Sequence, residues 1–169
     1  GRNAKAPDGF ELDIENGNSL RTPFFLDLRP GNFCNLACRM CFTRVSSGVN
    51  DLHRDHPELE EVTGESYWHE VNDWIDDPIR FEEIKSWIPN TRTLKLAGGE
   101  PLFMPGVIKL LRWCVESGNT HLHLDITTNG TRTQGKVLKW LEQFHSVDIQ
   151  LSIDGIGAVN DYIRSGSKW

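Results

Sequence analysis

Four short runs of strand-forming residues alternate with segments of helical periodicity along most of this 169-residue chain. The runs cover residues 23–28, 93–97, 121–127 and 147–153. Between the last three runs, apolar residues recur at intervals of three and four, which is the period of one helix face. Strand, helix and strand in regular order predict parallel strands joined by right-handed crossovers, and hence an α/β fold.

The connections between these runs differ in length. The helix expected after the second run has clear ends, because Pro105 stands where a proline can open a helix and Gly118 where a glycine can close one. The first connection is much longer. In it, residues 46–64 have few apolar anchors and are predicted to form an exposed insertion. The apolar residues of 67–75 and 81–88 predict further helices after the insertion.

Four βα units make half of an eight-unit barrel, which needs about 250 residues in its complete form. This chain is too short to close such a barrel. The chemically unusual residues follow or end the predicted strands, at 34–41, 98–101, 129–130 and 152–155. In parallel α/β folds, that edge of the sheet binds ligands.

Composition excludes several classes of protein. The chain is 38% hydrophobic and 25% charged, as in ordinary globular domains. It has no apolar run of about 18 residues and no signal-peptide pattern, so we expect no membrane partner and a cytoplasmic location. The formal net charge of -6, with basic residues scattered singly, argues against a nucleic-acid partner.

Three of the four cysteines lie within eight residues, in the stretch CNLACRMC that contains Cys34, Cys38 and Cys41. This crowding is unlike an extracellular disulfide framework, in which spaced pairs cross-link distant parts of the chain. Burial of all three on one helix face is an alternative. Gly31-Asn32 just before the cluster and Arg39 within it instead favour a loop that wraps a ligand.

Two kinds of metal site fit three cysteines. A structural zinc needs a fourth ligand, from His53, His56 or Cys114, but the histidines look like solvated loop residues and Cys114 lies on an apolar helix stripe. A 4Fe-4S cluster usually takes one thiolate per iron, so three cysteines leave one iron open to a ligand that is not protein. From the residues alone, a noncatalytic zinc-binding or iron-sulfur module stays an alternative to an enzyme.

Three motifs resemble those of the radical S-adenosylmethionine superfamily in order and spacing: the CxxxCxxC just described, the GGEP of residues 98–101 and the SIDG of residues 152–155. The stretches DLRPGNFCNLACRMC, LAGGEPLF and SIDGIGAVNDYIRSGSKW resemble its twitch-domain-containing members. The resemblance covers residues 23–169 and leaves residues 1–22 as an N-terminal extension. It implies the first four units of a partial (βα)6 TIM-type barrel, and we expect the core to be incomplete at its C-terminus.

The resemblance implies a radical chemistry. Cys34, Cys38 and Cys41 would hold a 4Fe-4S cluster, and the amino and carboxylate groups of S-adenosylmethionine would chelate its fourth iron. One-electron reduction, by a partner such as flavodoxin or ferredoxin, would split the sulfonium bond. The resulting 5′-deoxyadenosyl radical would abstract hydrogen from a substrate, either a peptide, a protein or a small metabolite.

Further residues are implied to contact S-adenosylmethionine, several of them with an alternative role. Glu100 would add a carboxylate near the amino group or, alternatively, serve as a charge at a helix N-terminus. Arg164 would pair with the cofactor carboxylate or make a surface salt bridge. Arg39 would offset thiolate charge or be an exposed loop charge, and Asn129 would be a turn residue first. The full set implied to bind the cofactor is Met40, Gly98, Gly99, Glu100, Pro101, Asn129, Ser152, Asp154 and Arg164.

Overall fold

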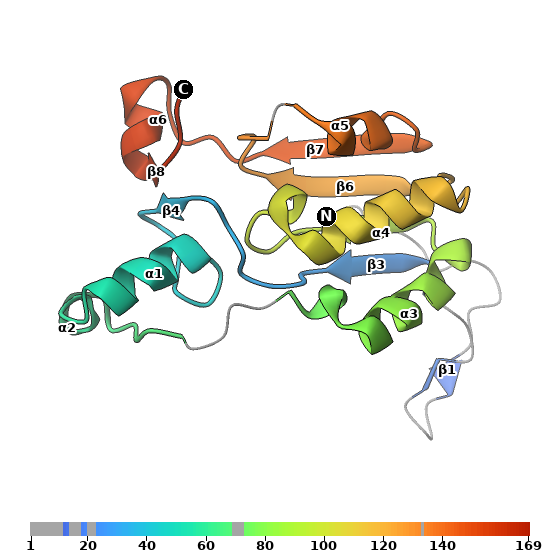
Figure 1. Ribbon diagram of the computed structural model, residues 1–169, viewed down its shortest axis with the longest axis horizontal. Coiled ribbons are helices and arrows are strands. Elements are labelled where there is room, and N and C mark those ends of the chain that lie inside the picture. The colour runs from blue at the N-terminus through green and yellow to red at the C-terminus, as the bar shows by residue number, and fades with distance from the viewer. Residues whose placement is uncertain (1–11, 14–17, 20–22, 69–72, 133) are drawn as a thin grey trace.

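The structure, a computed structural model, describes residues 12–13, 18–19, 23–68, 73–132 and 134–169. Its main sheet contains four parallel strands in the order β3-β5-β6-β7 (Figure 1). Leu26 pairs with Leu94, Leu94 with Leu124, and Ile126 with Ile149. The predicted parallel α/β fold is therefore confirmed. The strands are β3 (Phe25–Leu28), β5 (Thr93–Leu96), β6 (His123–Thr128) and β7 (Ser146–Leu151).

The core lies between the sheet and three helices. Leu94, Leu96 and Leu124 are fully buried because alternate residues of a strand point to the same face. They belong to one apolar cluster with residues of α3 (Pro78–Trp87), α4 (Pro105–Glu116) and α5 (Lys136–Leu141). The helix α4 opens with Pro105 and is followed by Gly118 at a φ of 74°, so both predicted ends are confirmed.

The opposite face of the sheet carries polar side chains. Lys95 Nζ lies 3.3 Å from Asp125 Oδ2, and Gln150 Nε2 donates to Asp125 Oδ1 at 2.9 Å. These residues come from three neighbouring strands. The two faces of the sheet therefore differ sharply in chemistry, which explains why the strands read as alternating rather than continuously apolar.

Several short elements lie beyond the carboxyl ends of the strands (Figure 1). The strand β4 (Ala37–Cys38) pairs antiparallel with β8 (Arg164–Ser165), which follows α6 (Ala158–Ile163). The helices α1 (Ser47–Asp55) and α2 (Leu59–Thr63) follow β4. Cys38 and Arg164 are direct partners in the β4-β8 pair, so this pair brings the cysteine-containing segment next to the last described residues of the chain.

The predicted exposed insertion at residues 46–64 is wrong over its first half. The helix α1 and its N-cap residue bury Ser46, Asn50 and His53, which are at most 6% exposed. Ser46 and Asn50 are buried through hydrogen bonds, and Val49 is the buried apolar residue of α1. Residues 56–64 are mostly exposed, as predicted.

The remaining elements are short. Three 3-10 turns are formed by η1 (Trp74–Asp76), η2 (Ile88–Asn90) and η3 (Pro101–Phe103), and β1 (Leu12–Asp13) pairs with β2 (Asn18–Ser19). The helix predicted over 67–75 is not seen at residues 67 and 68, and Val71 lies outside the described residues. Within the described parts of the chain, every helix is too short or too polar to cross a membrane.

Candidate functional site

The cysteine loop, residues 29–41, begins directly after β3. Three backbone hydrogen bonds hold the end of β3 and this loop to the segment that follows β5, and they continue the pairing of the two strands. Ala97 N donates to Leu28 O at 3.1 Å, Gly99 N to Gly31 O at 3.0 Å, and Glu100 N to Phe33 O at 2.8 Å. The first cysteine therefore follows a stretch of backbone that is fixed on one side by the sheet.

Gly98 and Gly99 allow this close approach. A Cβ atom on Gly98 would lie 2.8 Å from Gly31 O, and Gly98 also has a φ of 113°. A Cβ on Gly99 would overlap Phe33 O and lie 2.7 Å from Asn32 C. Only glycine fits at such positions without moving the backbone. The two glycines are needed here for contact between two protein loops, a reason that sequence reasoning did not give.

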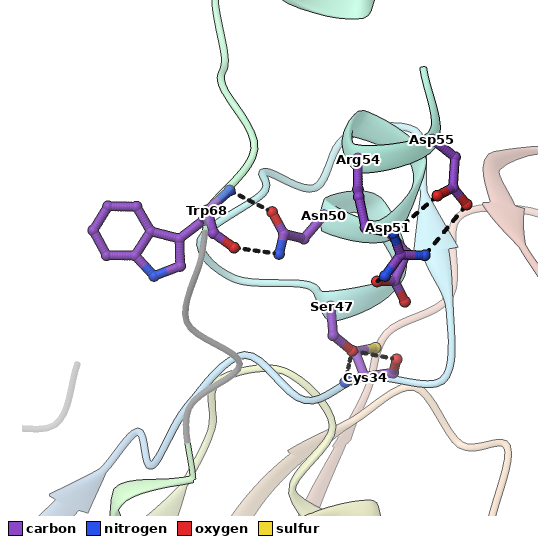
Figure 2. Close-up of polar contacts among 7 residues, drawn as sticks. All are labelled: Cys34, Ser47, Asn50, Asp51, Arg54, Asp55 and Trp68. Atoms are coloured by element: carbon purple, nitrogen blue, oxygen red, sulfur yellow. Dashed lines mark hydrogen bonds and ion pairs between the residues drawn. The ribbon is translucent and has the colours of Figure 1, made fainter. Parts of the chain in front are cut away.

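The N-terminus of α1 fixes the other side of the cysteine loop (Figure 2). The Ser47 hydroxyl accepts from Cys34 N and donates to Cys34 O, both at 3.0 Å. The Ser46 hydroxyl donates to Leu36 O at 2.8 Å. Because both hydroxyls are buried, these bonds replace solvent on the loop backbone. Sequence reasoning missed both serines, although a Ser-Ser pair before a helix is a capping signal.

Glu100 is fully buried and joins two strand ends. Its Oε1 accepts from Leu102 N at 3.2 Å and from the Thr128 hydroxyl at 2.7 Å, and its Oε2 accepts from Asn129 N at 2.6 Å. The bond from Leu102 caps η3, in agreement with the alternative role of a charge at a helix N-terminus. The carboxylate is engaged with protein donors, and it sets the position of the loop after β6.

Asn129 links that loop to the first cysteine. Its Nδ2 lies 3.9 Å from Cys34 Sγ and donates to Asn35 Oδ1 at 3.0 Å. Its Oδ1 accepts from the backbone and the hydroxyl of Thr131, as expected of a turn residue. The Asn35 amide in turn donates to the Thr131 hydroxyl at 2.9 Å. Asn35 and Thr131 are therefore members of the site that sequence reasoning missed.

Arg164 and Asp154 lie beside the second cysteine. Arg164 Nη2 is 2.7 Å from Asp154 Oδ2, and Arg164 Nη1 is 3.9 Å from Cys38 Sγ. The Arg164 side chain is only 14% exposed, and its buried Nε has no hydrogen-bond partner among the described residues. A buried donor without a partner costs free energy, so this guanidinium is suited to a further acceptor. The predicted surface salt bridge exists, but it is largely buried.

The cysteines differ in acidity. A hydrogen bond with Cys41 lowers the pKa of the Cys38 thiol to about 7, and the positive charge of Arg164 acts in the same direction against burial. The same hydrogen bond, together with burial, raises the pKa of the Cys41 thiol far above its usual range. Burial also raises the pKa of the Cys34 thiol, although the N–H group of Leu36 opposes it. Positive charge and N–H donors thus already face two of the three sulfur atoms.

Arg39 and Met40 are exposed, whereas Pro101 is buried. Arg39 stacks on the Tyr162 ring at 4.0 Å and donates through Nε to Tyr162 O, so the alternative of an exposed charge holds for it. It joins the cysteine loop to α6. Met40 is 46% exposed. Pro101 is buried at the start of η3.

Ser152 lies at the edge of a cavity of about 550 Å³. Its backbone N donates to Thr128 O at 2.9 Å, which fixes the chain just after β7. Asn35 and Asn129 line the same cavity, and residues 166–169 close one side of it. The structure therefore brings together the cysteine loop, the loop after β6 and the loop after β7.

The available ligands distinguish the two predicted kinds of metal site. Among the described residues, no three His, Cys, Asp or Glu side chains converge closely enough to hold a single metal ion. His56 is exposed beside Glu58, while Cys114 is buried in the apolar core. His53, predicted to be solvated, is buried on α1. A structural zinc needs four ligands, whereas three thiolates suffice for a 4Fe-4S cluster with one open iron, so the donor set fits a cluster better than zinc.

Comparison with known proteins gives a consistent result. A family model described as the Radical SAM superfamily matches residues 28–169. The mycofactocin maturase MftC of Mycobacterium ulcerans is 30% identical over 137 residues, which are 80% of this chain and 31% of the relative. The sporulation killing factor maturation protein SkfB of Bacillus subtilis is 25% identical over 84% of this chain and 29% of the relative.

A solved structure resembles this fold. Streptococcus suis SuiB bound to S-adenosylmethionine has a TM-score of 0.53 and 20% identity, over 85% of this chain and 28% of SuiB. SuiB bound to the precursor peptide SuiA gives a TM-score of 0.51 at 18% identity, over 85% and 27%. This chain thus spans about a third of the length of such relatives.

Proposed function

Because the chain belongs to the radical SAM superfamily, we propose that Cys34, Cys38 and Cys41 hold a 4Fe-4S cluster with one iron open to S-adenosylmethionine. The observation that carries this proposal is the environment of the three thiols. They lie in one loop beyond the carboxyl ends of parallel strands, with an asparagine amide near Cys34 and a guanidinium near Cys38. When bound, the two cofactors supply the one-electron chemistry that abstracts hydrogen from a substrate.

The other residues of the site are proposed to bind and orient S-adenosylmethionine. We assign Arg164 to the carboxylate of S-adenosylmethionine, since its guanidinium lies beside Cys38 and its Nε has no hydrogen-bond partner among the described residues. Ser152 and Asp154 are assigned to the ribose side of the cofactor. Asn129 is placed as a polar contact, because its amide faces both Cys34 and the cavity.

The GGEP segment has a divided role. The backbone of Gly98, Gly99 and Pro101 is proposed to face the cofactor amino group, and the backbone of Met40 its adenine. Glu100 is proposed to act indirectly and not through the expected contact with the amino group of S-adenosylmethionine. It is a positioning residue whose carboxylate fixes Thr128 and Asn129.

The proposed substrate of the whole protein is a peptide. Support comes from SkfB, which is a maturation protein, and from SuiB, which was solved with a precursor peptide. We further propose the twitch-domain subtype, a core of six βα units of which this chain holds the first four, an electron donor such as flavodoxin or ferredoxin, and a cytoplasmic location. Residues 1–22 are proposed to be an extension outside that core.

Iron content tests the ligand assignment. After anaerobic reconstitution, the chain should bind about four irons, and Cys38→Ala should lose the cluster. Cys114→Ala is the matched control, because this thiol lies in the apolar core. One zinc per chain in a colourless protein would instead support a noncatalytic zinc module. Full iron content in Cys38→Ala would overturn the assignment.

A further inference from the structure

A second cavity, of about 600 Å³, opens at the carboxyl ends of β3, β5 and β6. One wall is formed by residues 29–32 of the cysteine loop, whereas Asn35 of that loop lines the first cavity. The loop therefore separates two cavities. Lys95, Ala97 and Thr127 belong to the second one, which places it over the polar face of the sheet.

The second cavity is basic. Arg29, Arg44 and Lys95 line it, and none of its described lining residues is acidic. Two of these cations have a neighbouring carboxylate, since Arg29 lies 3.3 Å from Asp27 and Lys95 lies 3.3 Å from Asp125. For Arg44, the described part of the chain supplies no carboxylate within ion-pair distance. A surplus positive charge thus lines a cavity in a chain of net charge -6.

Arg44 is held by an indole ring. Its guanidinium carbon lies 4.5 Å from the centroid of the Trp68 ring. Trp68 is fixed in turn by Asn50, whose Nδ2 donates to Trp68 O and whose Oδ1 accepts from Trp68 N, both at 2.7 Å (Figure 2). Asn50 is fully buried on α1, so the support for Trp68 is rigid.

A guanidinium stacked on a ring keeps its N–H edge available. That edge matches the two oxygens of a carboxylate, and stacking reduces the entropy lost on binding. Trp74, which donates through Nε1 to Arg29 O at 3.1 Å, adds a second indole, and Val45 adds an apolar side chain. Such walls accept an apolar or aromatic group next to the anion.

We propose that the second cavity binds a carboxylate of the peptide substrate, with Arg44 as its anchor and an apolar substrate side chain against the indoles. The inference rests on the proposed function for the identity of the ligand as a peptide. The carboxylate has two sources in a peptide, an acidic side chain or the C-terminus. Both present the same two oxygens to Arg44.

Three synthetic hexapeptides test the proposal. All share one 4-fluorophenylalanine in a glycine-alanine frame. The first has a glutamate and an amidated C-terminus, the second a glutamine and an amidated C-terminus, and the third a glutamine and a free C-terminal carboxylate. Dissociation constants are measured by fluorine NMR on the purified chain at low salt.

At least one carboxylate peptide should bind about tenfold more tightly than the neutral one, the scale of one charged hydrogen bond. The peptide that shows the preference identifies the source of the carboxylate. Arg44→Gln should remove the preference, and Arg44→Lys should keep part of it. Arg112→Gln, which changes an exposed arginine paired with Glu116 on α4, should leave the preference intact.

Equal binding of all three peptides would overturn the proposal, as would an unchanged preference in Arg44→Gln. Arg44 is exposed, so its replacement should leave the unfolding midpoint near that of the wild type. The measurement needs no cluster. A charge-dependent affinity in a chain that fails to bind iron would therefore refute the radical chemistry while retaining this cavity.

Discussion

Replacing Glu100 by glutamine should destabilise the chain strongly, although the two side chains have nearly the same shape and volume. The carboxylate is fully buried and accepts three hydrogen bonds, two on Oε1 and one on Oε2. Glutamine keeps the shape and volume of the side chain but has one oxygen and one NH₂ group. In either position, the NH₂ group faces a hydrogen-bond donor of the protein and cannot accept its hydrogen bond.

The cost follows from those contacts. If the NH₂ group replaces Oε2, it faces Asn129 N, so one charge-assisted bond is lost and a buried donor is left without an acceptor. A charged hydrogen bond contributes about 1.5–3 kcal/mol and an unsatisfied buried donor costs about 1–3 kcal/mol, which predicts a loss of roughly 3–5 kcal/mol. The reversed amide disrupts the bonds from Leu102 and Thr128 instead.

Urea unfolding at neutral pH measures this loss, and Glu116→Gln provides the matched control. Glu116 pairs with Arg112 on the exposed surface of α4, where such a pair contributes about 0.5 kcal/mol or less. In Glu100→Gln, the alkylation rate of Cys34 should also rise, because Asn129 loses its anchor beside that thiol. Similar unfolding free energies for the two variants would refute the reasoning about Glu100.

Three further predictions concern the same region and the core. Arg164→Ala should leave iron content unchanged and weaken S-adenosylmethionine binding by about 1.5–3 kcal/mol, as measured by calorimetry. Arg39→Ala is the control. An affinity equal to that of the wild type would remove Arg164 from the site. Gly99→Ala should destabilise the chain more than Gly64→Ala. An added Cβ overlaps Phe33 O in the first case, whereas in the second it meets nothing within 4 Å and costs only the strain of a φ of 71°. Equal unfolding midpoints would contradict this. Burial raises the pKa of Cys114 to about 12, above its value in the unfolded chain, so this thiol should resist alkylation at pH 8.5 until urea unfolds the protein. The unfolded chain releases that proton first, so stability should fall as pH rises above about 9, and Cys114→Ala should reduce that slope.

The sheet and its covering helices were predictable because their signal is local. Leu94 and Leu96 alternate with polar residues, and the apolar residues of α4 recur with the helical period. The pattern within each element therefore predicts which of its faces is buried. The helix α1 was not predictable in this way. Its buried residues Ser47 and Asn50, and its N-cap residue Ser46, form hydrogen bonds with backbone groups of other segments. The periodicity of apolar residues does not predict hydrogen bonds between a polar side chain and the backbone of another segment.

The site was predictable in its residue types but only partly in their roles. The cysteines and the GGEP segment stood out by their spacing. Sequence reasoning could not tell which arginine faces the thiols, since Arg39 is nearer along the chain and Arg164 is nearer in space. That distinction depends on the β4-β8 pair, which joins residues 126 positions apart.

Electron paramagnetic resonance tests the central claim most directly. The chain is reconstituted anaerobically, reduced with dithionite, and measured with and without S-adenosylmethionine. If the open iron takes the cofactor, a reduced 4Fe-4S signal should appear and its g-values should shift when S-adenosylmethionine is added. A cluster signal that is identical in both samples, in this chain and in a longer chain with the remaining units, would contradict the account.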